Sequence, residues 1–212
     1  MSYTFSAAAA EFLESYQRDT PLRWSPADLA AQQHFVNVQV AGDNWLDWST
    51  PSAAWQLAQA SHAQVPVAAP ETSDAVRAVL LAGPMVELLE PSALFRQARE
   101  PVGPDGRLIG IIPCLRDNSP ESDRFIQLAR EALWPYYTAE ELLEVLRESG
   151  WQIEPQVGGF VSVPAFNRAV LDDQLAFKGF NRVFARLSAE GYDPMEVGWG
   201  ELRFVARVAS DC

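Results

Sequence analysis

The sequence has 212 residues, of which 48% are hydrophobic and 21% are charged, a composition typical of one globular domain with a sizeable core. Sixteen Lys and Arg against 28 Asp and Glu give a net charge of -12, which argues against a nucleic-acid partner because such binding relies on clustered basic residues. No run of residues is long and apolar enough for a membrane span, and the two cysteines lack the spacing of a metal or redox motif, so we expect a cytoplasmic protein with no membrane partner.

Two helices are predicted within the first 40 residues. In the segment 5–16, Phe5, Phe12 and Tyr16 recur at helical spacing among alanines. The second helix, over 25–38, begins with a cap residue, a proline at the first helical position and an acidic residue in the first turn. No linker-like stretch follows, so we expect both helices to pack beside or over the cleft of the same domain.

Strands and helices alternate in the middle of the chain. Residues 44–48 predict a short buried strand, followed by a helix over 51–61 and a weak strand candidate over 64–69. The segments 76–82 and 107–113 are stronger strand candidates, and the second is apolar throughout, as in strands that are buried on both faces.

Helix-start and turn signals separate these strands. A short helix is predicted over 91–100, and Pro104-Asp105-Gly106 is typical of a turn. A further helix begins at Ser119-Pro120 and ends near residue 133. The segment 138–141 (Thr-Ala-Glu-Glu) is a capping box, and the helix that it starts is expected to stop at Gly150.

The last third of the chain completes the alternating pattern. Residues 151–163 are extended, with Gly158-Gly159 as a turn or bulge, and residues 175–189 predict a helix before a final strand over 201–208. Alternation of this kind predicts an α/β fold with a mostly parallel sheet and helices on both faces. The final strand is expected to join antiparallel, at or near an edge.

The segment 76–151 resembles the second half of a class I, Rossmann-like SAM-dependent methyltransferase domain. The strand 79–81 and the following Pro-Met-Val-Glu-Leu-Leu at 84–89 are similar to the family's fourth strand and to the loop where substrate meets the methyl donor. Residues 103–108 resemble its turn and fifth strand, residues 137–142 the helix before its sixth strand, and residues 204–207 its last strand.

The resemblance implies a three-layer Rossmann-like sandwich with a mostly parallel sheet, a shortened first half and an antiparallel last strand. The whole chain, 1–212, is then a single domain. Within it, residues 1–40 form N-terminal helices, residues 43–163 the core sheet and helices, residues 164–200 a helical insertion, and residues 201–209 the last strand.

The expected cofactor loop departs from the family pattern. In the family the first strand ends in an acidic residue, which Asp47 matches, and the loop that follows carries several glycines. Glycine allows backbone conformations that other residues avoid, and the loop's free N–H groups contact the cofactor. Here the glycine positions fall on Ser49, Pro51 and Ala53, and Pro51 has no N–H to donate.

The ribose-binding side of the expected site is also altered. The family's acidic residue at the end of the second strand aligns with Ala68-Ala69, and Glu71 lies two residues beyond. Only 26 residues, 50–75, separate the first strand from the next strong one. Since one βαβ unit takes about 30 residues, we expect one strand–helix unit to be missing or collapsed.

Three functional hypotheses follow from this resemblance. In the first, the protein has lost SAM binding, needs no cofactor and serves as a binding or structural subunit. In the second, it is an active SAM-dependent methyltransferase on a small molecule. In the third, it catalyses other chemistry in the same cleft. The residual cofactor cleft would be formed by Asp47, Ser49, Glu71, Gly83 and Met85, and no catalytic residue is assigned.

Other residues have a functional and a packing interpretation. Trp45, Trp48 and Trp55 would line a ligand cleft or, as we expect, fill the space left by the cofactor. The aromatic stripe Phe177, Phe180 and Phe184 would pack against the sheet or form a surface for a protein partner or for self-association. His34 and His62 have no metal or triad spacing, and Cys114 is expected to be a small buried residue.

Overall fold

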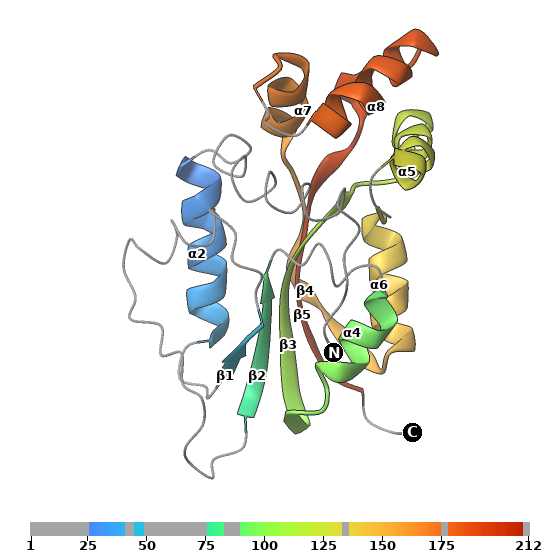
Figure 1. Cartoon of the computed structure of the whole chain (residues 1–212). Coiled ribbons are helices and arrows are strands. Elements are labelled where there is room, and N and C mark those ends of the chain that lie inside the picture. Colours follow the sequence, from blue (N-terminus) through green and yellow to red (C-terminus); the bar gives the residue numbers. More distant parts are fainter. Residues whose placement is uncertain are drawn as a thin grey trace.

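The structure, a computed structural model, describes residues 26–40, 45–48, 76–82, 90–132, 136–174 and 178–209. Its centre is a five-stranded sheet with the strand order β1-β2-β3-β5-β4 (Figure 1). The strands are β1 (Trp45–Asp47), β2 (Val76–Ala82), β3 (Val102–Leu115), β4 (Trp151–Ser162) and β5 (Trp199–Val208). β1, β2 and β3 are parallel, and β5 is antiparallel to both β3 and β4. The predicted α/β sheet with an antiparallel last strand is therefore confirmed, with β5 lying next to the edge strand β4.

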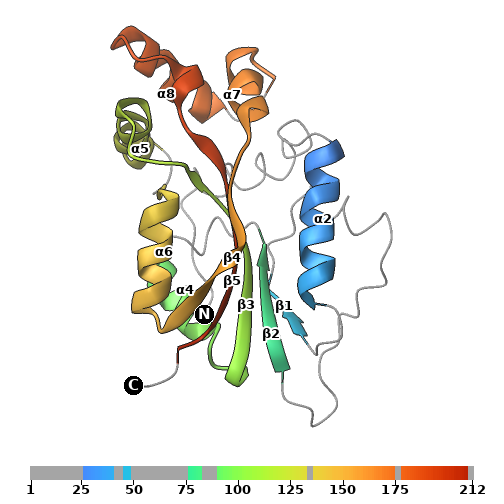
Figure 2. The same cartoon turned by 180° about the vertical axis from the view of Figure 1, so that it is seen from behind.

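Helices cover both faces of the sheet and one of its ends. Of the α-helices in the described ranges, one lies on one face, two lie on the other, and three gather beyond the end of the sheet that is uppermost in Figure 1 (Figures 1 and 2). In that order they are α2 (Pro26–Val40); α4 (Pro91–Gln97) and α6 (Ala139–Glu148); and α5 (Pro120–Ala132), α7 (Pro164–Leu171) and α8 (Lys178–Ala189). A short 3-10 helix, η2 (Pro194–Glu196), leads into β5.

Each face of the sheet has its own apolar core, because alternate residues of a strand point to opposite faces. On the α2 face, Ile109 and Val205 pack with Val36. On the α4 and α6 face, Leu108 and Leu202 belong to a second cluster. β2 and most of β3 are buried on both faces, which explains why their sequences are apolar almost without interruption.

One predicted turn lies inside a strand instead. Residues 104–106 are part of β3, which begins at Val102. The pairing with β2 passes from Val76↔Val102 directly to Ala78↔Arg107, so the extra residues of β3 form a bulge. Proline, aspartate and glycine favour both turns and bulges, and the local sequence does not distinguish the two.

The capping box that starts α6 is formed as predicted. The Thr138 hydroxyl accepts the Glu141 N–H at 3.2 Å, and the Glu141 carboxylate accepts the Thr138 N–H at 2.7 Å. The helix is followed by Gly150, whose φ of 82° lies in the region that favours glycine. These local signals fix both ends of α6.

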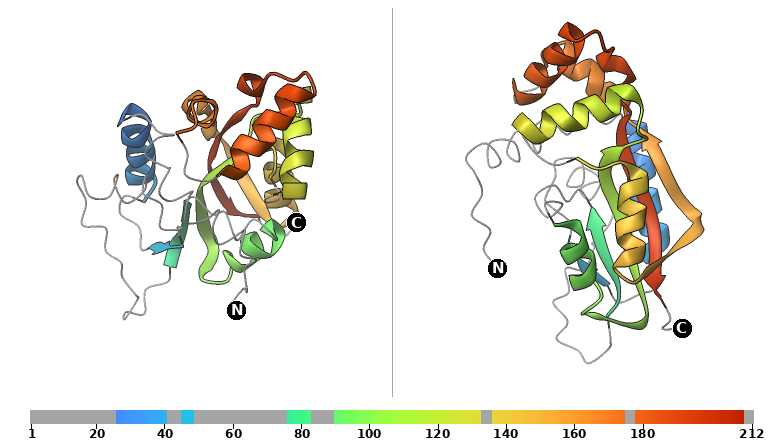
Figure 3. Two further views of the ribbon diagram at one scale, coloured as in Figure 1. Left: turned by 45° about the horizontal axis from the view of Figure 1, so that its top comes forward. Right: turned by 90° about the vertical axis from the view of Figure 1, so that its right-hand side faces the viewer.

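The edge strand β4 contains a large bulge. Ile153 pairs with Ala206 and Gly158 with Phe204, so residues 154–157 face a single residue of β5. Gly158 and Gly159 have φ values of 90° and 145°, which agrees with the predicted turn or bulge at this pair. The right-hand view of Figure 3 shows β4 bending away from β5.

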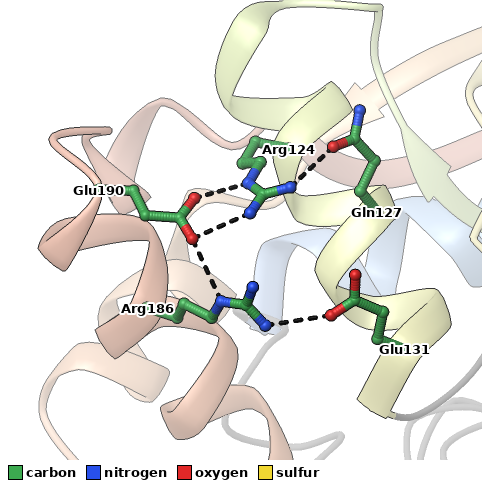
Figure 4. A network of polar contacts seen from close by, with 5 residues as sticks. All are labelled: Arg124, Gln127, Glu131, Arg186 and Glu190. Carbon is green, nitrogen blue, oxygen red and sulfur yellow. Dashed lines mark hydrogen bonds and ion pairs between the residues drawn. The ribbon is translucent and has the colours of Figure 1, made fainter.

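The helices beyond the end of the sheet enclose an aromatic core around Trp199. Its ring stacks on Phe166 with centroids 4.2 Å apart and contacts Phe125 and Phe180 edge-on at 6.1 and 5.8 Å. On the outside, α5 and α8 are joined by ion pairs (Figure 4). Between the two helices, Arg124 pairs with Glu190 at 2.6 and 2.9 Å and Arg186 with Glu131 at 3.0 Å. Arg186 also pairs with Glu190 at 3.1 Å, and Arg124 donates a hydrogen bond to the Gln127 side-chain oxygen at 2.8 Å.

Several predictions fall on residues outside the described ranges. They are the helices over 5–16 and 51–61, the weak strand over 64–69, and the missing strand–helix unit within 50–75. The division of the chain into the four predicted segments also stays a prediction.

Candidate functional site

The carboxyl ends of β1, β2 and β3 meet at one edge of the sheet, because these strands are parallel. Ligands of open α/β folds bind outside this edge. The backbone N–H of Trp48 donates to the Leu80 carbonyl at 2.8 Å, so the parallel pairing continues one residue past β1. The sequence that follows, from Ser49 onwards, corresponds to the expected cofactor loop and lies outside the described residues.

Most residues of the predicted cleft lie beyond the described part of the chain. Asp47 is the last residue of β1 and pairs with Leu80, which agrees with its predicted place at the end of the first strand. Ser49, Glu71, Gly83 and Met85 fall outside the described residues. The structure therefore positions one of the five predicted cleft residues, and only its backbone.

The tryptophans near this edge differ in burial. Trp45 is 8% exposed and packs in the core beneath α2, as expected for a ring that repairs a core. Trp48 is 37% exposed, whereas a ring that fills a vacated pocket should be largely buried. Trp55 lies outside the described residues.

A buried polar cluster near the same end of the sheet was missed by the sequence analysis. Glu201 is 1% exposed, and Arg203 donates from Nε to its Oε1 at 2.6 Å. Gln32 of α2 donates from Nε2 to the other oxygen, Oε2, at 2.7 Å. Both carboxylate oxygens of Glu201 are thus engaged, and the pair Gln32–Glu201 joins α2 to the centre of the sheet.

The position of the cluster follows from the strand register. Glu201 pairs with Pro113 of β3 and Val161 of β4, so it lies between the two neighbouring strands. A signal was present in the sequence. Glu201 and Arg203 stand two apart in a strand whose only other charged residue is Arg207, and this spacing places them on one face. Their partner Gln32 is 169 positions away from Glu201, and no local pattern could have identified it.

The electrostatics of the cluster are set mainly by burial. Removal from water raises the pKa of Glu201 to about 7, the charge and hydrogen bond of Arg203 and the hydrogen bond of Gln32 lower it, and the Asp28 carboxylate of α2 adds to the increase. In the ionised form the carboxylate accepts from Arg203 and Gln32, which anchors α2. Loss of the Glu201 carboxylate would leave the buried Arg203 guanidinium without an ion-pair partner.

Cys114 is buried, as predicted. Its side chain is 0% exposed, and burial raises the pKa of the thiol far above its ordinary value. A thiolate is the reactive form of cysteine, so Cys114 is unsuited to act as a nucleophile. It belongs to the core on the α4 and α6 face.

The two histidines give no sign of a metal or catalytic site. His34 is exposed on α2, and His62 lies outside the described residues. In the described ranges, no group of three or more His, Cys, Asp and Glu side chains is arranged to hold a metal ion. No helix among the described residues is long and apolar enough to span a membrane.

The aromatic stripe predicted as either packing or a partner surface is used within the chain. Phe180 and Phe184 are 3% and 2% exposed, in the same cluster as Phe125, Phe166 and Trp199. The packing interpretation therefore fits these two rings, although they pack mainly beyond the end of the sheet. Phe177 lies outside the described residues. Binding of a protein partner, or self-association, stays a prediction.

Comparisons with protein-family models and with curated protein sequences give no match for this chain. Solved structures do share its fold. The cyclase SpnF aligns over 98% of this chain and 98% of its own, with a TM-score of 0.55 and 15% identity. The geranyl diphosphate C-methyltransferase of Streptomyces coelicolor, solved with S-adenosyl-L-homocysteine, aligns over 98% of this chain and 100% of its own, with a TM-score of 0.53 and 10% identity.

A third structure, a protein from Bacillus halodurans assigned as a methyltransferase, covers 85% of this chain and 99% of its own, with a TM-score of 0.52 and 13% identity. At such low identities the likeness establishes the fold and leaves the activity open. The parallel strands β1, β2 and β3, the antiparallel β5 and the helices on both faces agree with it. The chain has the Rossmann-like fold of the class I SAM-dependent methyltransferases.

Proposed function

We propose that this protein is a methyltransferase-like subunit whose SAM-binding loop is degraded, and that it acts by binding rather than by methyl transfer. The observation that carries the proposal is the sequence that leaves β1. The stretch from Asp43 to Ala82 contains no glycine, and Pro51 stands within the expected cofactor loop. The fold supports this interpretation, because the cofactor loop follows the first strand in the class I methyltransferase fold and this sequence follows β1.

The physical argument concerns backbone contacts. A glycine-rich loop lets the main chain approach a ligand and donate N–H groups to its carboxylate. Pro51 lacks the N–H and fixes φ near -65°. A lost hydrogen bond weakens binding by about 0.5–1.5 kcal/mol, and by more if the carboxylate is left unpaired.

The ribose side of the expected site supports the same proposal. No acidic residue stands at Ala68-Ala69, where relatives of this fold class would hold the ribose hydroxyls, and Glu71 lies two residues further on. Two such losses combined would weaken SAM binding by roughly two orders of magnitude, since about 1.4 kcal/mol corresponds to a factor of ten.

The described side chains near this end of the sheet offer little to a reaction. Both carboxylate oxygens of Glu201 are engaged with Arg203 and Gln32, and Cys114 is fully buried. These groups stabilise the fold and the position of α2. A role in binding or assembly requires no free acid, base or nucleophile among them.

An active methyltransferase on a small molecule is the second candidate. It is favoured by Asp47, which ends β1 where the family has its acidic residue. The candidate is also supported by the structure of the geranyl diphosphate C-methyltransferase, which contains S-adenosyl-L-homocysteine and aligns over 98% of this chain. The two candidates differ in one measurable property, the affinity for SAM.

A thermal-unfolding assay with 1 mM SAM or S-adenosyl-L-homocysteine distinguishes them. Wild-type protein is expected to be stabilised by no more than about 0.4 kcal/mol, the value for a dissociation constant of 1 mM. A dissociation constant of 10 µM would instead stabilise the folded state by about 2.7 kcal/mol at that concentration, and such a result would favour the active enzyme.

Two matched loop variants separate the causes of weak binding. Pro51→Ala restores the N–H donor, and Pro51→Gly combined with Ala53→Gly restores both the donor and the backbone freedom. If the loop alone is responsible, the glycine variant should gain more SAM-dependent stabilisation than Pro51→Ala. If neither variant gains any, the altered ribose side is the larger defect.

A further inference from the structure

A cavity lies at the edge of the sheet opposite β1, beside β4. It has a volume of about 680 Å3 and is bordered by α6, the bulged part of β4 and residues 202–204 of β5. The bulge creates it, because residues 154–157 leave the register with β5. Gly158 resumes the pairing so closely that a Cβ there would lie 2.3 Å from the Arg203 carbonyl oxygen.

The walls of the cavity are largely hydrocarbon. Leu143 of α6 and Ile153 and Val157 of β4 are half-buried, whereas Trp151 and Phe204 are almost fully buried at 1% exposure each. The indole N–H of Trp151 donates to the Phe95 carbonyl at 2.8 Å, so its polar atom is already used. A ligand here would meet apolar surface on most sides.

One cation stands at the rim of this cavity with no ion-pair partner among the described residues. Arg147, in the last turn of α6, is exposed and lines the cavity. The Glu154 carboxylate also borders the cavity, but its charge is offset by Arg207, whose Nε lies 2.6 Å away. Arg203 also borders the cavity and is paired with Glu201. The cation left for a ligand is therefore the Arg147 guanidinium.

We propose that this cavity binds a small apolar carboxylic acid, with its hydrocarbon part against Leu143, Ile153 and Val157 and its carboxylate on Arg147. The volume falls within the range of small-molecule sites, which are mostly apolar with a few placed polar groups. A guanidinium pairs with a carboxylate through two parallel hydrogen bonds. A single cation on a protein of net charge -12 favours a monoanion over a dianion.

This site is separate from the cofactor cleft and does not rest on the function proposed above. The strand order places β4 and β1 at opposite edges of the sheet. Loss of SAM binding, or its presence, leaves the cavity unchanged.

The test is a calorimetric titration of the full chain with decanoate, below its micelle concentration. Decyltrimethylammonium has the same chain length and the opposite charge, and serves as the comparison. We expect decanoate to bind with a dissociation constant of about 2 mM or below, and the cation to bind at least tenfold more weakly. Equal binding of both probes, or no binding of decanoate, would overturn the proposal.

Three variants locate the binding. Arg147→Gln removes the cation and should weaken decanoate binding about tenfold. Arg168→Gln makes the same change in the last turn of α7, away from the cavity, and should leave the affinity unchanged. Leu143→Trp should block the cavity and abolish binding, with circular dichroism confirming that the variant is folded. Wild-type affinity in Arg147→Gln or in a folded Leu143→Trp would contradict the assignment.

Discussion

The buried carboxyl of Glu201 makes the stability of this protein depend on pH in a defined direction. Its pKa is raised from an ordinary value of 4.5 to about 7, first by burial. The folded state therefore holds the proton more tightly than the unfolded chain. Between these two pH values the unfolded chain has lost a proton that the folded protein retains, so the free energy of unfolding falls as pH rises.

The magnitude follows from the same difference. One pKa unit corresponds to 1.36 kcal/mol, so the full loss from pH 4.5 to above pH 7 is about 3 kcal/mol. The sequence pI is about 4.5, and solubility is lowest near that value. Measurements are better begun at pH 5.5, from which about 2 kcal/mol of the loss remains to be observed.

The perturbation that isolates this group is Glu201→Gln, which cannot titrate. Urea unfolding of wild type and variant at pH 5.5 and pH 8 gives two differences in the free energy of unfolding. The account predicts that the variant gains about 2 kcal/mol relative to wild type between these pH values. The variant is expected to be less stable than wild type in absolute terms, because Arg203 loses its charged partner, so only the change with pH is compared.

A matched control is Glu190→Gln, at the surface position directly after α8. The pKa of Glu190 is lowered to about 2 by Arg124 and Arg186. Its stabilising effect is present above the unfolded pKa and is lost only as pH falls below about 4.5. The difference between Glu190→Gln and wild type should thus stay constant from pH 5.5 to pH 8. A constant difference for Glu201→Gln as well would refute the reasoning.

Two further predictions concern packing and backbone geometry. Trp199→Ala should lower the free energy of unfolding by about 3–5 kcal/mol, because it leaves a cavity beside Phe166; a loss below 1 kcal/mol in urea unfolding would show that the aromatic core is not tightly packed. Gly158→Ala should destabilise the protein more than Gly191→Ala, although their φ values are 90° and 89°, because the new methyl at 158 meets the Arg203 carbonyl while that at 191 meets open space. Equal losses in thermal unfolding of the two variants would contradict the close approach of β4 to β5.

The fold was predictable wherever local signals and burial agreed. The apolar runs of β2 and β3 and the capping box at Thr138 appear in the structure at the expected places. The turn predicted at 104–106 was wrong, because residues that favour turns also favour bulges and only the pairing with β2 decides between them. The antiparallel direction of β5 was expected from the resemblance to the methyltransferase fold, and the structure confirms it.

The polar parts of the molecule were much less predictable. Glu201 finds Gln32 across 169 positions of the sequence, and Arg147 comes to border a cavity only because β4 leaves its register 7 to 10 residues later, over 154–157. Contacts of this kind depend on tertiary packing, which local patterns do not encode. The predicted cleft residues Ser49, Glu71, Gly83 and Met85 lie outside the described residues, so their role stays a prediction.

The central claim, that the loop after β1 no longer binds SAM, is tested most directly by calorimetric titration of SAM into the wild-type protein. The account predicts a dissociation constant of about 1 mM or weaker, which is roughly two orders of magnitude above 10 µM, because the loop and ribose contacts are missing. A saturable one-to-one titration with a dissociation constant in the micromolar range would contradict it, and would make the protein an active methyltransferase candidate despite Pro51.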